Sequence, residues 1–207
     1  MSLDLIALLH EKTSNRCKSF YSIMPLVNIP SVVQMGILSY DRAQEHPHKS
    51  IALDSVQARR DRVIIPNGQR LHSYANLYFT YLNPMMYKRK DIAETFCILA
   101  VDLRVLLIEG CVLADQNAAR DFVKFYTPEG GLNNIDFDLV FARSWVDDNP
   151  YSQSLKKAIK CAEILIPDSI PYEYIKGAFV VSHEAREQLR DNGFHKEIIV
   201  NPRAFYR

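Results

Sequence analysis

The stretch KCAEILIP, residues 160–167, places one carboxylate, that of Glu163, inside an apolar run that is typical of a buried strand. Taking a carboxylate out of water is costly, so a strand that keeps one is either half exposed or functional. In a cleft, Glu163 could accept a hydrogen bond from a ribose hydroxyl or take a proton from a weak nucleophile. The pattern also fits an outward-facing glutamate in an alternating strand. Glu173 is a second candidate for the functional acid, although a position in a surface loop explains it more simply.

A second set of candidates combines a helical arginine pair with ring and amide side chains that follow it: Gln57, Arg59, Arg60, His72, Tyr74, Asn76 and Tyr78. The planar fork of Arg suits phosphate, and a Tyr or His ring can stack on a base or on nicotinamide. A solvated helix face beside a core strand explains the same residues, because paired arginines are common on surfaces. The later run MMYKR is equally ambiguous, since its methionines suit a core while its basic end could meet phosphate.

The composition narrows the class of protein without selecting a function. With 207 residues, 48% of them hydrophobic, the chain can bury about 70% of its unfolded surface, and we expect a single domain over residues 1–207. Twenty-five Lys and Arg against 24 Asp and Glu give a net charge of +1, which leaves room only for a local basic patch. Four cysteines without a CxxC motif predict reduced core thiols and neither a disulfide framework nor a metal site.

Several familiar sites and segments are missing from the sequence. The seven glycines form neither GxGxxG nor GxxxxGK[ST], and GxSxG and HExxH are also absent, which argues against Rossmann, P-loop, serine-hydrolase and zinc-protease sites. No stretch resembles a signal peptide or reaches the roughly 18 apolar residues of a membrane span. We therefore expect a soluble, cytoplasmic protein with no membrane partner.

The elements that must position the candidates follow from periodicity and capping signals. We expect helices over 3–12, 29–36, 53–63, 116–126 and 151–161, with Asn28 capping the second, and a surface loop over 39–50. Strands are expected over 17–24, 94–103, 109–115, 162–167, 177–182 and 197–202, with a further β-like run from residue 75 that Asn83-Pro84 interrupts. This mixture favours an α+β fold over a regular parallel βαβ array.

The order of these segments resembles a known family. YSIMPLVNIPSVVQMGIL, then SIALDSVQARRDRVIIPNGQRLHSYANLYFTYLNPMMY, then CAEILIP is similar to the DarT family of DNA ADP-ribosyltransferase toxins, from about residue 20 to the C-terminus. The shared elements are the short helix ending in Gly, the QARR helix, LHSY, and the YF…NPM segment. The resemblance implies a compact ADP-ribosyltransferase (PARP-like) fold in which a split central β-sheet, flanked by helices, clasps NAD.

The resemblance also assigns roles to residues. It implies that ADP-ribose is transferred from NAD, as co-substrate and without a metal, to a base of single-stranded DNA, with Glu163 and Arg60 as the catalytic pair. The NAD-binding positions that it implies are Tyr21, Ser22, Asn28, His72 and Tyr78. Ser22 stands where the family commonly has a His that bonds the NAD ribose, and a serine hydroxyl reaches less far and cannot stack. NAD is therefore expected to be held somewhat differently here.

We expect Glu163 to lie at the mouth of the NAD cleft and to steady the oxocarbenium-like ribose by bonding its 2′-hydroxyl. Glu163, or Arg60 acting with it, is expected to help remove the proton of the acceptor base, while Arg60 itself clamps phosphate or orients the base. For the DNA strand we expect stacking on aromatic side chains and phosphate contacts from basic ones: Tyr74, Tyr87 and Trp145, then Lys88, Arg89 and Arg143.

The sequence does not determine which DNA base is modified or which protein partner the chain has. The family has branches that modify thymine or guanine, and the sequence gives no physical reason for our slight preference for guanine. A macrodomain antitoxin that removes the modification (DarG-like) is implied by the family alone. Two other classes fit the residues: a protein-directed ADP-ribosyltransferase, and a non-catalytic module that binds single-stranded nucleic acid without consuming NAD.

Overall fold

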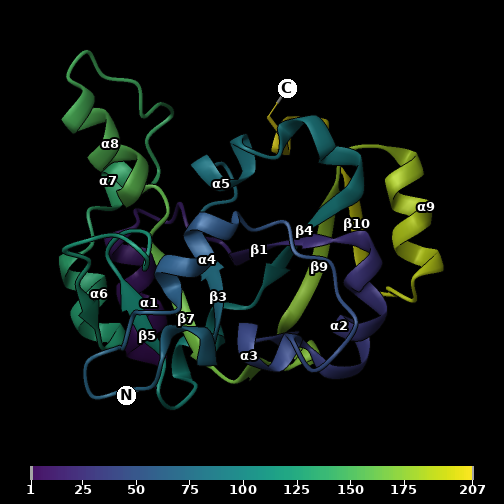
Figure 1. The fold of residues 1–207 in the computed structure, drawn as a ribbon, viewed down its shortest axis with the longest axis horizontal. Coiled ribbons are helices and arrows are strands. Elements are labelled where there is room, and N and C mark those ends of the chain that lie inside the picture. Colours follow the sequence, from purple (N-terminus) through teal and green to yellow (C-terminus); the bar gives the residue numbers. More distant parts are fainter. Residues whose placement is uncertain (1, 207) are drawn as a thin grey trace.

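The computed structural model describes residues 2–206, whose largest element is an eight-stranded sheet in the order β10-β9-β4-β1-β3-β7-β5-β6 (Figure 1). Its strands are β1 (Phe20–Pro25), β3 (Tyr74–Tyr78), β4 (Phe96–Val101), β5 (Val112–Ala114), β6 (Phe125–Tyr126), β7 (Glu163–Pro167), β9 (Ile175–Val180) and β10 (Glu197–Val200). The β9–β10 pair is parallel, and the other neighbours are antiparallel. A second, two-stranded sheet pairs β2 (Ile37–Leu38) with β8 (Ser169–Ile170).

The large sheet is almost divided between β1 and β3. β1 pairs with β4 along six residues, and β3 pairs with β7 along five. Between β1 and β3, within the described chain, only Tyr21 and Tyr78 are paired. The expected α+β fold with a split central sheet is therefore confirmed, since this single pair joins β1 and β3 among the described residues.

Helices flank the sheet. They are α1 (Ser2–Lys12), α2 (Ile29–Met35), α3 (Tyr40–Ala43), α4 (Asp54–Arg60), α5 (Pro84–Tyr87), α6 (Pro128–Asn134), α7 (Phe137–Val140), α8 (Pro150–Ile159) and α9 (His183–Asp191). Short 3-10 helices cover Leu26–Asn28, Leu71–Ser73, Lys90–Thr95, Leu103–Leu107, Tyr172–Tyr174 and Pro202–Ala204. Figure 1 shows α9 at the β10 end, α6 and α8 at the opposite end, and α4 and α5 over the middle. None of the helices in residues 2–206 has the length and apolar character needed to span a membrane.

Apolar side chains of both sheet halves form the core. All six residues of β4 are buried, and Phe79 packs edge-to-face against Phe20 and Phe137, with ring centroids 5.4 and 5.2 Å apart. Full burial of one such side chain stabilises the fold by about 1.5–3 kcal/mol. The predicted reduced core thiols are confirmed: Cys17, Cys97, Cys111 and Cys161 are free and buried, and burial raises the pKa of each to about 12.

Local signals explain where several helices begin and end. Asn149 accepts hydrogen bonds from the backbone N–H groups of Tyr151 and Ser152, so it caps α8, which begins at Pro150, close to the predicted start at residue 151. Gly36 ends α2 in the left-handed region, with φ +80°, where a Cβ would lie 2.1 Å from the backbone oxygen of Ile170. Only glycine allows this close passage, which lets β2 pair with β8.

Most of the expected elements are present, but the helix predicted over 116–126 is wrong. That segment is an irregular loop followed by β6, because the backbone N–H of Asp115 donates to the oxygen of Lys124 and closes the chain on itself. The expected surface loop 39–50 begins with α3, and α6 and α9 were not expected. The predicted cap of α2 is also wrong, since the Asn28 side chain makes no capping hydrogen bond.

Candidate active site

Glu163 begins β7 and is completely buried. Its carboxylate accepts hydrogen bonds from Arg60 Nη1, at 3.0 Å to Oε1 and 2.9 Å to Oε2. The backbone N–H of Ala118 donates a further hydrogen bond of 2.9 Å to Oε1. The alternative of an outward-facing glutamate is therefore wrong, and the cost of burying the charge is offset by an ion pair and a backbone donor.

Arg60 is the last residue of α4 and stands between the carboxylate and a cavity. Its side chain is 9% exposed and lines the cavity, whereas Glu163 does not. The expectation that Glu163 lies at the cleft mouth is thus wrong, because Arg60 covers it. Among the described residues, the guanidinium donates to protein only through Nη1, which leaves Nε and Nη2 for a ligand.

The cavity measures about 450 Å³, within the range of small-molecule sites, and lies beside the Tyr21–Tyr78 pair that joins β1 and β3. Its described lining has no Asp or Glu but seven cationic side chains: Lys49, Arg59, Arg60, Lys88, Arg89, Arg120 and Lys157. A wall with one sign of charge concentrates anions in the cleft. On a nearly neutral protein this cavity is the local basic patch that composition left possible, and it suits a dinucleotide pyrophosphate or DNA phosphates.

Residues 48–53 form one wall of the cavity, and they belong to the segment 46–53, here called the strap, which leads into α4. The Asn28 side chain holds it from one side: its Oδ1 accepts from the backbone N–H of Lys49 and its Nδ2 donates to the Lys49 oxygen, each at 2.9 Å. Arg89 holds it from the other side, donating to the backbone oxygens of Ile51 and Ala52 at 2.5 and 3.1 Å. The strap leads directly into α4 and so fixes the helix that carries Arg60.

His72 supports the neighbouring wall. Its ring is buried, stacks on Tyr40 with centroids 4.1 Å apart, and lies 3.1 Å from the side-chain oxygen of Gln57. Burial and the nearby Arg60 charge lower the pKa of His72. A neutral ring at pH 7 can keep Gln57 and Tyr40, which both line the cavity, in fixed orientations.

Ser22 and Tyr78 also line the cavity, as the resemblance implied for NAD-binding positions. Tyr78 lies opposite Glu163 in the β3–β7 pair. Burial, together with the negative charge of Glu163, raises the pKa of Tyr78, so its hydroxyl keeps its proton and can donate a hydrogen bond at neutral pH.

Three predicted contacts do not fit the structure. Tyr21 does not line the cavity, because its ring packs edge-to-face on Tyr81 in a separate apolar cluster. Tyr74 borders the cavity but is buried, and its hydroxyl accepts from the backbone N–H of Gln69, so it offers no surface for stacking DNA. Arg89 uses its guanidinium on the strap, as described above, instead of presenting it to a phosphate.

Two of the residues predicted to stack on DNA, Tyr87 and Trp145, contact each other near the surface. Tyr87 contacts Trp145 and Tyr206 edge-to-face, with ring centroids 5.6 and 5.4 Å apart, and the last two rings are 5.9 Å apart. We call these three rings the aromatic cluster. Tyr87 is 44% exposed and lies between two cavity-lining residues in sequence, Met85 and Lys88. Arg143 is exposed on the loop that carries Trp145.

Sequence reasoning missed the strap and Phe122. Residues 46–50 of the strap fell in the predicted polar surface loop 39–50, although the buried Ile51 follows directly after them. Phe122 was placed on a predicted helix, yet it is 95% exposed. The charged pair Arg120-Asp121 directly before Phe122 is the local signal for its exposure.

A divided sheet with a cationic cavity and a buried Glu–Arg pair at the division defines an α+β protein of the ADP-ribosyltransferase class. The chain belongs to the DarT family: the family model described as "ssDNA thymidine ADP-ribosyltransferase, DarT" matches residues 21–206.

Individual relatives agree with this assignment. The chain is 26% identical over 202 residues to a DNA ADP-ribosyl transferase–DNA ADP-ribosyl glycohydrolase fusion protein of Thermosipho africanus, covering 92% of this chain and 50% of the relative. It is 24% identical over 180 residues to a DNA ADP-ribosyl transferase of Thermus aquaticus, covering 82% of this chain and 78% of that protein. The chain thus spans half the length of the Thermosipho fusion protein.

Solved structures show the same fold. The Thermosipho africanus DarTG structure in complex with ADP-ribose matches with a TM-score of 0.78 and 25% identity, over 91% of this chain and 51% of that one. The Thermus sp. 2.9 DarT structure in complex with ADP-ribosylated ssDNA matches with a TM-score of 0.78 and 23% identity, over 92% and 97% of the two chains.

Proposed function

We propose that this chain transfers ADP-ribose from NAD to thymidine in single-stranded DNA and releases nicotinamide. The observation that carries the proposal is the buried Arg60–Glu163 pair behind a cavity wall with seven cations and no carboxylate. The description of the matching family model names thymidine, which supports this base over the guanine that we had preferred from sequence. The Thermus sp. 2.9 relative has been solved with NAD+ and with ADP-ribosylated ssDNA, and both ligands suit an anion-binding cavity.

The residues present fit NAD. The cationic lining can neutralise the pyrophosphate, and the protonated hydroxyl of Tyr78 can donate to the sugar or the nicotinamide amide. In our proposal three further residues complete the binding site. Ser22 contacts NAD from the cavity wall, Asn28 holds the strap in place, and His72 holds the side chain of Gln57.

The reaction breaks the glycosidic bond between ribose C1′ and nicotinamide, and the bonding electrons leave with nicotinamide. Positive charge then develops on the ribose, where a carboxylate bonded to the 2′-hydroxyl stabilises it. For Glu163 to do this, Arg60 has to give up one carboxylate oxygen and move its donors toward the ligand. A ring nitrogen of the base forms the new bond to C1′, and its proton passes to Glu163, with Arg60 orienting the base.

A single strand is the appropriate substrate because its bases are already accessible, whereas a duplex would first require the target base to be extracted. We further propose that the aromatic cluster stacks bases next to the target, with Lys88 and Arg143 on the phosphates. We also propose a macrodomain antitoxin partner that removes the modification. Support for it is the Thermosipho relative, whose name joins a transferase to a glycohydrolase.

The test is nicotinamide release with and without oligonucleotides, combined with mass spectrometry of the DNA. The expected result is that an oligonucleotide containing thymidine gains the mass of one ADP-ribose, while one in which every thymidine is replaced does not. Modification of a guanine-containing, thymidine-free strand would refute the proposed base. A label on polypeptide instead would indicate a protein-directed transferase, and binding without NAD consumption would indicate a non-catalytic module.

A further inference from the structure

Phe122 has a conformation and an environment that folding does not explain. Its side chain is 95% exposed, the largest exposed fraction among the large hydrophobic residues that the structure describes. Its backbone lies in the left-handed region, with φ +64°, which is strained for a bulky residue. A buried ring could repay such strain, but this ring gains no burial. Strained, exposed aromatic residues of this kind occur where a ligand is bound.

The loop that carries Phe122 is held firmly at several points. Besides the Asp115 N–H bond that closes it, Asp115 Oδ1 accepts from the backbone N–H of Lys124 at 3.0 Å. The backbone N–H of Asn117 donates to the oxygen of Ala158 in α8 at 3.0 Å, and Arg120 donates to Ser154 Oγ at 3.2 Å. The exposed ring is therefore presented on a fixed support.

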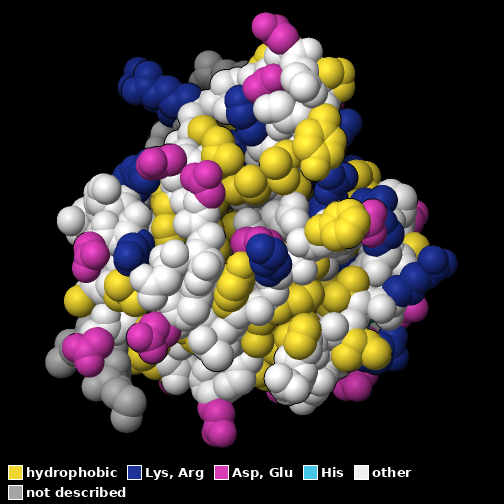
Figure 2. Space-filling model, turned by 90° about the vertical axis from the view of Figure 1, so that its left-hand side faces the viewer, with side chains coloured by type: hydrophobic (Ala, Val, Ile, Leu, Met, Phe, Trp, Pro, Cys, Tyr) yellow, Lys and Arg dark blue, Asp and Glu magenta, His cyan; other side chains and the backbone are white. Residues whose placement is uncertain are grey.

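The same loop touches the catalytic pair and the cavity. Four residues before Phe122, the backbone N–H of Ala118 donates to Glu163, and both Asn117 and Arg120 line the cavity. Phe122 thus stands two residues beyond a cation on the cavity rim. The face of the molecule that carries α6 and α8 shows exposed hydrophobic side chains among charged ones of both signs (Figure 2).

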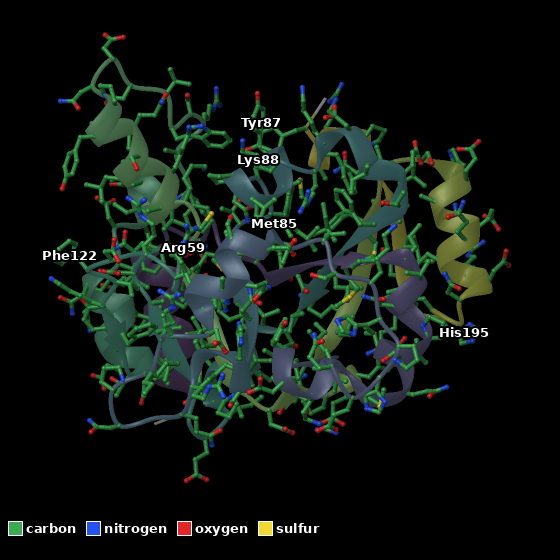
Figure 3. All side chains as sticks on the ribbon, in the orientation of Figure 1. Arg59, Met85, Tyr87, Lys88, Phe122 and His195 are labelled. Carbon is green, nitrogen blue, oxygen red and sulfur yellow. The ribbon has the colours of Figure 1, made fainter. Side chains whose placement is uncertain are left out.

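Phe122 and the aromatic cluster are separate. Figure 3 shows Arg59 between Phe122 on one side and Met85, Lys88 and Tyr87 on the other. Arg59, Met85 and Lys88 all line the cavity. Phe122 and Tyr87 therefore lie on opposite sides of Arg59 in this view, each close in sequence to a different cavity-lining cation, Arg120 and Lys88.

We propose that Phe122 is a stacking platform for a nucleotide that flanks the modified thymidine, on the side of the strand opposite to the nucleotides on the aromatic cluster. This inference rests on the proposed function. It adds Phe122 as a DNA-binding residue and gives the course of the DNA strand across the cavity. Every base has a face that can stack on a phenyl ring, and Arg120 and Lys157 supply the positive charge that the adjoining phosphates need. The strand thereby passes over the cavity and delivers the target base to it.

The experiment measures kcat/KM for oligonucleotides with a single thymidine, each with one abasic site at a successive flanking position. Wild type, Phe122→Ala, Phe122→Trp and Tyr87→Ala are compared. We expect Phe122→Ala to lower kcat/KM by about 5- to 100-fold, mainly through KM for DNA, and Phe122→Trp to restore most of it. With wild type, an abasic site at a stacked position should lower kcat/KM. In Phe122→Ala this decrease should disappear at one position on one side of the thymidine, and in Tyr87→Ala it should disappear at a position on the other side.

Ile64→Ala is the matched control, because Ile64 is 70% exposed and does not line the cavity, so its kcat/KM should equal that of wild type. Equal abasic penalties in Phe122→Ala and wild type at every position would overturn the inference, as would coupling of Phe122 and Tyr87 to the same flank. If wild type modified no oligonucleotide, the proposed function itself would be wrong. Modification by wild type without coupling to Phe122 would reject only the inference drawn here.

Discussion

Arg60 binds both carboxylate oxygens of Glu163 through one guanidinium nitrogen, Nη1, although the two residues are 103 positions apart in the chain. A fork-to-fork pair would occupy two nitrogens, so this arrangement leaves the rest of the guanidinium for a ligand. The same contact keeps the carboxylate out of the cavity until Arg60 moves. The Arg60 side chain therefore both covers the Glu163 carboxylate and can bind the substrate.

Glu163→Gln should abolish most of the activity and weaken the fold. Loss of the negative charge beside the ribose should lower kcat by about 100- to 1,000-fold or more. Arg60 would be left buried without a counter-ion, which should lower the free energy of unfolding by about 3–5 kcal/mol. Nicotinamide release and urea unfolding measure the two effects.

The double variant Arg60→Met/Glu163→Leu separates these effects. Replacing both charges with apolar side chains should recover most of the lost stability while activity stays absent. A double variant as unstable as Glu163→Gln would show that the buried pair is not the source of the destabilisation.

Arg89→Lys should weaken NAD binding although it keeps the charge. A lysine ammonium cannot reproduce the planar fork that holds the Ile51 and Ala52 oxygens of the strap. Loss of one charge-assisted hydrogen bond, about 1.5 kcal/mol, corresponds to about a tenfold rise in KM for NAD, with kcat changed less. Trypsin should also cleave faster after the exposed Lys49, and NAD should slow this cleavage.

For the strap prediction, Arg203→Lys provides a control at an exposed arginine outside the cavity. It should have the wild-type KM and the wild-type cleavage rate. Unchanged kinetics and proteolysis in Arg89→Lys would mean that its two hydrogen bonds do not position the strap.

Lys157→Gln should reduce the salt dependence of DNA binding. Each phosphate that a protein neutralises on a single strand contributes about −0.7 to the slope of log K against log salt concentration. Lys157 is exposed at the cavity rim, so its loss should make the slope shallower by about 0.7. Fluorescence anisotropy with a labelled oligonucleotide measures this slope, and Lys176→Gln, at an exposed lysine on β9, should leave it unchanged.

His72 should make the fold less stable in mild acid. Burial, followed by the Arg60 charge, lowers the pKa of His72 below its ordinary value of 6.5, so the unfolded chain takes up the proton more readily than the native protein. Its contribution to the free energy of unfolding is fully present above pH 6.5 and is lost as pH falls through the lowered native pKa. Unfolding of His72→Asn should therefore vary less with pH in this window than unfolding of the wild-type protein.

Features encoded locally could be predicted from the sequence. The apolar runs of β4, β7 and β9 and the helix α8 depend on neighbouring residues, and the order of short motifs indicated the family. The helix predicted over 116–126 failed because the C-terminal half of this segment has partners outside it: the Lys124 N–H donates to Asp115 Oδ1, and Phe125–Tyr126 pair with β5. Local periodicity contains no information about such partners.

The candidate site shows the same division. Glu163 and Arg60 were selected from the sequence as candidates. The sequence did not predict that they contact each other or that Arg60 covers Glu163, because both depend on how closely α4 approaches β7. Asn28 was assigned to a helix cap because Asn commonly caps helices, whereas the strap competes for the same side-chain amide and binds it at two points.

The four native thiols are buried and hold their protons at neutral pH, and only thiolates react readily with maleimides. The chain is therefore a nearly silent background for single-site labelling. A cysteine introduced at the exposed Val146, near the aromatic cluster, would accept one fluorophore without prior removal of native cysteines. Fluorescence could then report the arrival of a DNA strand in an enzyme whose core is untouched.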